Sequence, residues 1–197
     1  MELGLGKVKA VRKFVAKAAI TGLGQSTFSR EPGSSPRALA AQACLAALAD
    51  RSAGVDIIDG LLLNRSPIEP SEVLPLHLKR DLGLGDLSLL ASIEAEGSSA
   101  IQMIQYAALA IEAGGASNVL CVFADAPVRS AGAAKTYSGS MDLTGLPGWD
   151  ASSGLHGAVG AFAISAQRYF HVYGADDRAL YAAASADRAW ASLNPQA

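Results

Sequence analysis

The stretch Leu87–Ala124, LSLLASIEAEGSSAIQMIQYAALAIEAGGASNVLCVFA, decides the fold class of this chain. Its first seven residues are an apolar run, which predicts a strand at 87–93. Apolar residues then recur at helical spacing and predict a helix over 98–113, which a Gly-Gly pair ends. The run VLCVFA predicts a second buried strand at 119–124. Two strands joined by a helix indicate parallel pairing, because parallel strands need a long crossover connection.

The sequence before this stretch continues the alternation of strands and helices. Apolar runs at 18–23 and 57–63 predict two further strands, and the segments 36–49 and 73–82 predict helices. The sequence therefore predicts an α/β core over residues 18–126, in which helices cover a mainly parallel sheet.

The two ends of the chain differ in composition from this core. Residues 1–17 are basic, and we expect a solvated or partner-contacting arm, with a targeting segment as the alternative. Residues 127–155 are rich in Gly and Ser without periodicity, which predicts irregular chain of functional importance. Helices are predicted at 157–172 and 176–192, so residues 127–197 are expected to form a loop subdomain with closing helices.

The composition limits the function classes that are open to the chain. Of its 197 residues 50% are hydrophobic and 17% charged, so the chain can bury a core and is not intrinsically disordered. A net charge of −2 provides no general attraction to nucleic acid. No apolar run reaches the roughly 18 residues that a membrane span needs. The two cysteines have neither disulfide-framework nor metal-site spacing, so we expect a soluble, cytoplasmic protein without a metal.

A short run of small residues, EGSS at 96–99, joins the predicted strand to the long helix. Such an elbow presents side chains at a helix amino terminus, where unpaired N–H groups and the helix dipole stabilise negative charge. A cysteine there has a lowered pKa and acts as a nucleophile. In this chain Gly97 stands at that position, so the backbone N–H groups of the elbow are the candidate functional groups.

The run EAEGSSAIQMI, from Glu94 to Ile104, resembles the nucleophile region of thiolases, in which CGSGLQAV or ExxCASG is usual. The opening segment AAITGLGQSTF resembles that of sterol-carrier-protein-type, or lipid-transfer-protein-like, thiolases. Four segments are similar to thiolase segments in the same order, so that the resemblance extends from residue 18 to the last residue. They are AAITGLGQSTF at 18–28, IEAGGASNVLCVFAD at 111–125, RYFHVYG at 168–174 and NPQA at 194–197.

This resemblance implies the fold of a thiolase amino-terminal half. In thiolases two βαβαβ halves pack into a five-layered αβαβα sandwich, and we expect one such half here, with a mainly parallel five-stranded sheet and a loop subdomain. The second half supplies the acid and base of thiolases, so we expect either a partner chain that carries it or a truncated sequence. The resemblance also implies a homodimer through the strand from Val119 to Ala124.

The chain departs from thiolases at the nucleophile. Alignment of IQMI with LQAV places Gly97 where thiolases carry the acyl-accepting cysteine, and a shift by one residue places Glu96 there. Neither residue forms a thioester. Cys44 and Cys121 fall inside a predicted helix and a predicted strand, and we interpret both as small core residues. Covalent catalysis through a cysteinyl thioester is therefore not expected.

The resemblance implies a non-covalent reaction instead. Some thiolase-like proteins without the cysteine, notably in sterol side-chain degradation, act as retro-aldolases on β-hydroxyacyl-CoA thioesters, usually with a DUF35-type OB-fold partner. We expect an acyl-CoA-binding protein that assists C–C bond cleavage or formation, with a coenzyme A thioester as substrate and no covalently bound cofactor. A non-catalytic lipid-binding scaffold subunit and an acyltransferase that uses Ser98 or Ser99 are the alternatives.

The candidate site residues fall into three groups. Oxyanion donors and general bases are expected at the elbow, where a retro-aldol reaction needs both. Substrate-binding residues are expected in the irregular segment, because thiolases contact the pantetheine arm of coenzyme A there. The donors are Gly97, Ser98 and Ser99, the bases are Glu94 or Glu96, and the substrate-binding residues are His156 and Met141.

Overall fold

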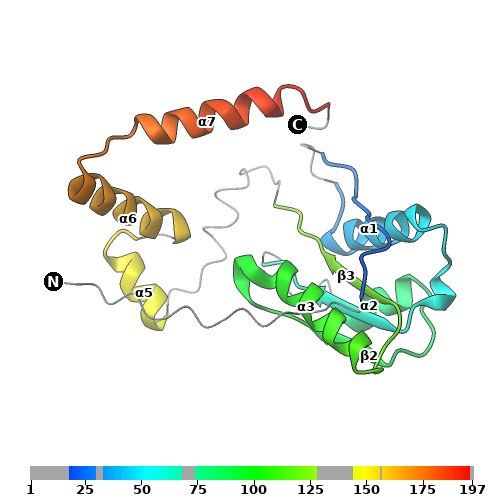
Figure 1. Cartoon of the computed structure of the whole chain (residues 1–197). Helices are drawn as coiled ribbons and strands as arrows, with labels where there is room; N and C mark the ends of the chain where they lie inside the picture. The colour runs from blue at the N-terminus through cyan, green and yellow to red at the C-terminus, as the bar shows by residue number, and fades with distance from the viewer. Residues whose placement is uncertain (1–17, 30–32, 68–73, 128–143, 156, 196–197) are drawn as a thin grey trace. The chain divides into compact units, whose positions relative to one another are not determined.

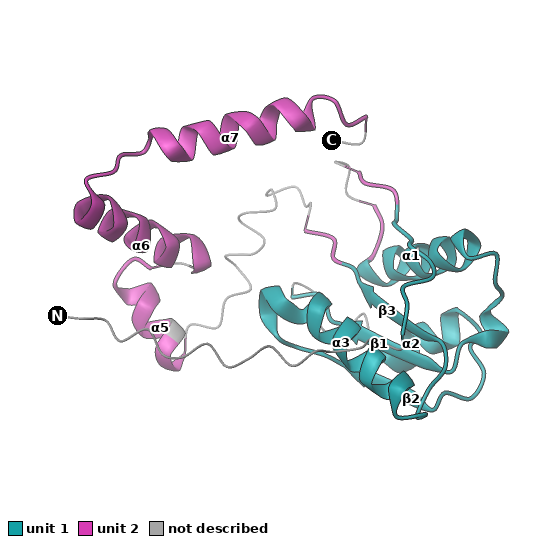
Figure 2. Cartoon of the chain, viewed as in Figure 1, with its two compact units in different colours: residues 1–26, 36–124 teal, residues 27–35, 125–197 magenta. Residues whose placement is uncertain are grey.

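The computed structural model describes the chain except for residues 1–17, 30–32, 68–73, 128–143, 156 and 196–197 (Figure 1). The chain divides into two compact units, which we describe separately (Figure 2). The first unit contains the described residues of 1–26 and 36–124. The second contains those of 27–35 and 125–197.

A small parallel sheet forms the centre of the first unit. Its strands are β1 (Gly60–Asn64), β2 (Leu89–Ser92) and β3 (Val119–Phe123), in the order β2-β1-β3. Both pairings are parallel, and Gly60 lies opposite Leu89 on one side and opposite Val119 on the other. The α/β class and three of the predicted strands are therefore confirmed.

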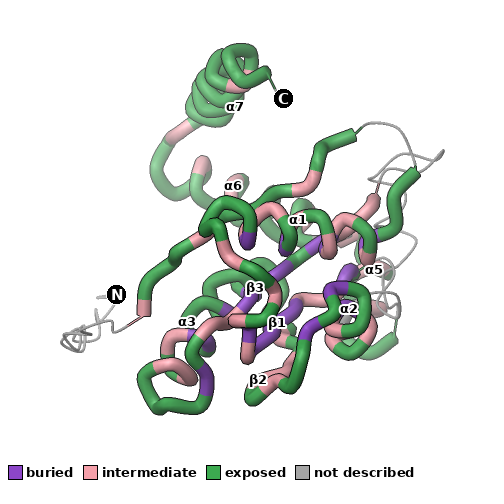
Figure 3. The backbone as a smooth tube through the Cα atoms, turned by 90° about the vertical axis from the view of Figure 1, so that its right-hand side faces the viewer, coloured by how far each residue is buried: buried purple, intermediate pink, exposed green. Residues whose placement is uncertain are grey.

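Helices cover both faces of this sheet. On one face lie α1 (Pro36–Asp50) and α2 (Pro75–Asp81), and on the other lies α3 (Ser99–Glu112). The consecutive residues Leu61, Leu62 and Leu63 of β1 are all fully buried, as the burial colours of Figure 3 illustrate for the strand. A strand covered on both faces needs such a continuous apolar run rather than an alternating one. The short 3-10 turns η1 (Val55–Ile57) and η2 (Glu96–Ser98) precede β1 and α3.

The end of α3 follows the prediction from its Gly-Gly pair. Gly114 has φ +74°, a conformation that glycine adopts without steric cost. The N–H of Gly115 donates to the carbonyl of Ala110 at 2.9 Å, and the N–H of Gly114 donates to that of Ile111 at 3.0 Å. These two bonds form a Schellman motif, which satisfies carbonyls at the helix end and returns the chain toward β3.

Asp59, directly before β1, connects the amino-terminal ends of all three strands. Its carboxylate accepts hydrogen bonds from the N–H groups of Ser117 and Asn118 at 2.8–2.9 Å. Its carbonyl accepts from the N–H groups of Ser88 and Leu89 at 2.8 and 3.2 Å. Desolvation alone raises the pKa of Asp59, but the hydrogen bonds from Asn118 and Ser117 outweigh it, and the pKa lies below its ordinary value.

Residues 18–23 correct one prediction, because they form no strand in the structure. The segment lies against α1 instead. The N–H of Leu23 donates to Asp50 Oδ2 at 3.0 Å, and a Cβ built on Gly24 would come within 2.1 Å of the Ala43 carbonyl oxygen. Ile20 and Leu23 are 68% and 75% exposed. The apolar, β-branched composition predicts a buried strand, but a strand also needs a neighbour to pair with.

The second unit is helical where the structure describes it. It contains α5 (Gly145–Ser152), α6 (Gly157–Tyr173) and α7 (Arg178–Ala191). The two closing helices were predicted, whereas α5 lies in the segment that was predicted to be irregular. Many large apolar side chains of α6 and α7 are exposed, among them Phe162 and Trp190. Among the described helices, none is long and apolar enough to cross a membrane.

Candidate functional site

The elbow between β2 and α3 contains an unusual backbone conformation. Glu96 has φ +48°, which costs an L-residue about 1–2 kcal/mol relative to the right-handed region. The 3-10 turn η2 follows at once, and α3 then begins at Ser99. Backbone strain of this kind persists only where the surrounding contacts fix it, and it is concentrated at functional sites.

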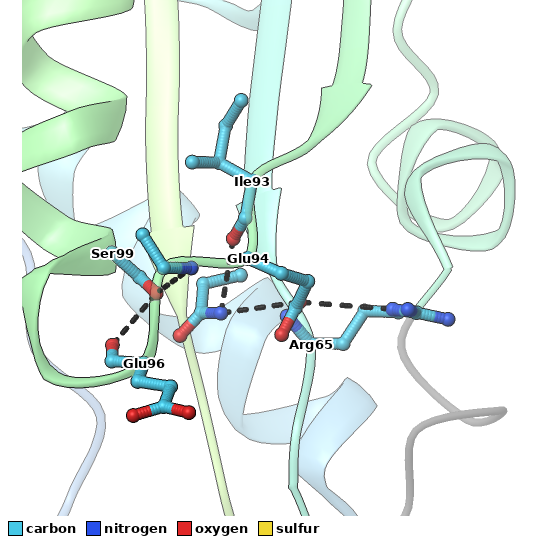
Figure 4. A network of polar contacts seen from close by, with 7 residues as sticks. Arg65, Ile93, Glu94, Glu96 and Ser99 are labelled. Atoms are coloured by element: carbon cyan, nitrogen blue, oxygen red, sulfur yellow. Dashed lines mark hydrogen bonds and ion pairs between the residues drawn. The ribbon is translucent and has the colours of Figure 1, made fainter.

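The side chain of Ser99 fixes this conformation. Its hydroxyl donates to the Glu96 carbonyl at 2.7 Å and accepts from the Ala95 N–H at 2.9 Å (Figure 4). Only 2% of Ser99 is exposed. Because both functions of this hydroxyl are occupied in a buried position, Ser99 is poorly suited to attack a substrate. The Ser98 hydroxyl is exposed and donates to the Ala95 carbonyl at 2.8 Å.

The three expected backbone donors differ in their hydrogen bonds. The Ser98 N–H donates to the Ala95 carbonyl at 3.0 Å, and the Ser99 N–H donates to the Glu96 carbonyl. The Gly97 N–H has no hydrogen-bond partner among the described residues. A Cβ built on Gly97 would meet nothing within 4 Å, so the space beside this residue is open. Of the three expected donors, Gly97 is thus the one whose N–H group is free to bind a ligand oxygen.

The two expected carboxylates also differ in their surroundings. Glu94 Oε1 accepts from the Arg65 N–H at 3.0 Å and from Asn64 Nδ2 at 3.2 Å, and Arg65 Nε lies 3.7 Å away (Figure 4). Asn64 Nδ2 also donates to the Ile93 carbonyl at 3.0 Å. Glu94 therefore ties the end of β1 to the end of β2. The carboxylate of Glu96 is exposed and has no polar partner among the described residues.

Asn64 and Arg65 bind Glu94 beside the elbow, and the sequence pattern alone singles out neither residue. Their position directly after a buried strand was the available signal, because polar residues at the carboxyl ends of parallel strands meet at one edge of the sheet. Here β1 and β2 end side by side, and their polar residues meet beside the elbow.

A surface hollow of about 310 Å³ lies along α3 and is bordered by Ile93, the residue that follows β2. The helix contributes Gln102, Gln105, Tyr106 and Leu109 to its lining. The hollow is open to solvent, and its lining consists of two apolar side chains, two amides and a phenol.

The two cysteines lie in different environments. Cys44 is buried in α1, and burial raises its pKa to about 12, as expected for a core residue. Cys121 on β3 is exposed, so its interpretation as a core residue is wrong. Its neighbours Leu120 and Val122 pack in the core cluster that includes α1 and α2. Because side chains alternate along a strand, Cys121 lies on the opposite face of the sheet, where α3 packs. Neither thiol belongs to the elbow, which lies at the start of α3.

The remaining predicted residues are not placed by the structure. His156 and Met141 lie outside the described residues. Within the described parts of the chain, no three His, Cys, Asp or Glu side chains gather closely enough to hold a metal ion.

Comparison with known proteins gives a consistent set of relatives. The chain is 32% identical over 185 residues to a 17-hydroxy-3-oxo-4-pregnene-20-carboxyl-CoA lyase of Mycobacterium tuberculosis (strain ATCC 25618 / H37Rv). It is 33% identical over 184 residues to a steroid side-chain-cleaving aldolase of Thermomonospora curvata. A solved structure described as an Ltp2-ChsH2(DUF35) aldolase matches with a TM-score of 0.73 and 31% identity. No family model matches the chain.

These matches cover most of this chain and less than half of each relative. They include 92%, 91% and 91% of the chain, but 47%, 46% and 44% of the lyase, the aldolase and the solved structure. The chain thus spans about half the length of the relatives that it matches. The similarities support the thiolase-like relationship that the sequence suggests, and the two relatives are named as a lyase and as a steroid side-chain-cleaving aldolase.

Proposed function

We propose that this chain is part of a lyase that cleaves a C–C bond in the side chain of a steroid coenzyme A thioester by a retro-aldol reaction. The observation that carries this proposal is the similarity of 92% of the chain to a lyase whose name specifies a 17-hydroxy steroid carboxyl-CoA. The elbow supports it, because its residues Glu96 and Gly97 provide no sulfur for a covalent route.

The reaction requires a base and an oxyanion site. A base removes the proton of the hydroxyl group at the β-carbon, and the oxygen electrons form a carbonyl as the Cα–Cβ bond breaks. The electron pair of that bond moves into the thioester and gives an enolate, which takes up a proton at Cα. For a 17-hydroxy steroid with a 20-carboxyl-CoA group, the products are a 17-ketosteroid and propionyl-CoA. Neither an oxidant nor a covalent intermediate is required.

The elbow offers a candidate base and a candidate oxyanion donor on the adjacent residues Glu96 and Gly97. We assign the Gly97 N–H to the enolate oxygen, since among the three expected donors it alone has no partner in the described residues, and the space on the Cβ side of Gly97 is open. The exposed Glu96 is the better candidate for the base, because Glu94 is already bound by Asn64 and Arg65. His156 and Met141 remain candidates for contact with the thioester arm.

The complete enzyme, in this proposal, contains more polypeptide than this chain. A second half would complete an αβαβα sandwich with five-stranded sheets, and the exposed apolar side chains Ile101 and Ile104 of α3 are available to pack against it. A DUF35-type protein is the proposed partner, since such a component is named in the similar solved structure.

The test uses the chain purified from its native host with the polypeptides that remain bound to it. The probe is 17-hydroxy-3-oxo-4-pregnene-20-carboxyl-CoA, in which C20 carries the thioester group. Its incubation with the purified material is expected to release a 17-ketosteroid and propionyl-CoA, measured by liquid chromatography and mass spectrometry. Glu96→Gln should abolish release, while the matched variant Glu94→Gln should retain part of it. No cleavage, or an acyl adduct on Ser98 or Ser99, would contradict the proposal.

A further inference from the structure

The carbonyl of Glu96 accepts two hydrogen bonds from the same residue. The Ser99 hydroxyl donates to it at 2.7 Å, and the Ser99 N–H donates to it as well (Figure 4). The hydroxyl is itself held in place, because it accepts from the Ala95 N–H at 2.9 Å. Only 2% of Ser99 is exposed, so water does not compete for these bonds. The direction of the Glu96 carbonyl is therefore fixed by Ser99.

This carbonyl shares one rigid plane with the Gly97 N–H group. The two groups belong to the peptide unit that joins Glu96 to Gly97, and no peptide bond among the described residues is cis. In a planar trans peptide the C=O and N–H bonds point in opposite directions. A carbonyl that points at Ser99 thus directs the Gly97 N–H away from Ser99. The missing hydrogen-bond partner of this N–H among the described residues agrees with that direction.

The residues on either side of this peptide plane do little to hold it. Gly97 has no Cβ and tolerates a wide range of φ, so it permits the plane to rotate. Glu96, with φ +48°, would relax if the elbow left its present conformation. A Cβ built on Gly97 would meet nothing within 4 Å, so packing around this residue does not restrain the plane either. The bonds from Ser99 are consequently the restraint on which its orientation depends.

We propose that Ser99 is a positioning residue, which aims the Gly97 N–H at the place where the enolate oxygen forms. This inference rests on the proposed function, in which that N–H is the oxyanion donor. Such donors are effective because they are oriented before the charge develops, so that none of the reaction energy is spent on turning them. Ser99 touches neither the substrate nor the reacting atoms in this arrangement, and it acts only through the Glu96–Gly97 peptide.

The kinetic test compares variants of the chain, each purified with the polypeptides that remain bound to it, with 17-hydroxy-3-oxo-4-pregnene-20-carboxyl-CoA as the probe. Loss of a whole oxyanion donor lowers kcat about 10²–10³-fold. Ser99→Ala keeps the backbone bond to Glu96, so we expect a smaller decrease in kcat, about tenfold, with KM changed by less than about twofold. Ser99→Cys, which keeps the size of the side chain but donates only weakly, should show the same pattern and replaces Ser99→Ala if that variant does not fold.

Met103→Ala is the control for a purely structural effect. Met103 is 3% exposed in α3 and packs with Leu62, away from the elbow peptide. Its truncation leaves a cavity and should destabilise the chain more than Ser99→Ala does. The folded Met103→Ala variant should nevertheless keep its kcat. An equal loss of kcat in both variants, or a raised KM at constant kcat in Ser99→Ala, would overturn the inference.

The direction of the N–H group is also measurable without any activity. In the weakly aligned full chain, the ¹⁵N–¹H residual dipolar coupling of Gly97 reports the orientation of this bond. The coupling should fit the structure in the unsubstituted chain and deviate in Ser99→Ala, while the couplings of β1 stay the same. An unchanged Gly97 coupling in Ser99→Ala would overturn the inference. Absence of probe cleavage by the unsubstituted complex would refute the proposed reaction, whereas the coupling would still decide whether Ser99 aims the N–H group.

Discussion

Replacement of Ser99 by alanine tests whether this buried hydroxyl holds the elbow in its strained conformation. The substitution removes the bond that the hydroxyl donates to the Glu96 carbonyl and the one that it accepts from the Ala95 N–H. The Ala95 N–H is then left without its partner, and an unsatisfied group of this kind costs about 1–3 kcal/mol. We expect Ser99→Ala to lower the free energy of unfolding by about 2 kcal/mol. For a chain of this size that is a decrease of about 4–8 °C in Tm.

Ser98→Ala is the matched control, since it removes a hydroxyl from the adjacent residue. The Ser98 side chain is exposed, and its bond to the Ala95 carbonyl is replaceable by water. The control should change the free energy of unfolding by less than about 0.5 kcal/mol. Urea unfolding followed by circular dichroism gives both values. Equal effects of the two substitutions would refute the role of Ser99 in fixing the elbow.

Three further predictions follow from other residues. Glu96→Gly should stabilise the chain by about 0.5–1 kcal/mol in urea unfolding, because glycine relieves the positive φ, while Glu96→Ala should bring no such gain. The pKa of Asp59 is lower in the folded chain than the ordinary aspartate value of about 3.9. The ionised carboxylate therefore stabilises the fold above about pH 3.9, and this stabilisation is lost as the pH falls through the folded-state pKa. Unfolding curves of Asp59→Asn should therefore depend less on pH in this acidic range, and an unchanged pH profile would argue against the proposed amide contacts. Desolvation raises the pKa of Cys121 to about 11, so its alkylation by iodoacetamide in the native chain should speed up as the pH rises toward that value. Cys44 should react only after unfolding, and mass spectrometry showing early modification of Cys44 would contradict its burial.

The sequence was most informative where one local signal determines one element. The Gly-Gly pair after α3 gives the helix end, and the unbroken apolar run of β1 gives a strand covered on both faces. These features depend on neighbouring residues alone. The strand at 119–124 and the closing helices were predicted for the same reason.

The sequence was least informative where a feature depends on distant residues. The segment 18–23 has the composition of a strand, but pairing depends on a neighbour that no local pattern specifies. The exposure of Cys121 depends on what covers the edge of the sheet and the α3 face. At the elbow, composition predicted a turn, whereas the positive φ of Glu96 and the bonds of Ser99 appear only in three dimensions.

The contacts of Asp59 have a consequence for the far end of the sheet. One residue fixes the starting level of β1, β2 and β3, through its carboxylate on one side and its carbonyl on the other. The strands are four or five residues long, so their ends lie about 15 Å beyond this common origin. Because the strands begin level and have nearly equal length, they also finish level. The position of Glu94 and Gly97 relative to the carboxyl end of β1 thus depends on the register that Asp59 fixes at the amino-terminal ends of the strands. A change of that register would displace the elbow, although Asp59 makes no contact with it.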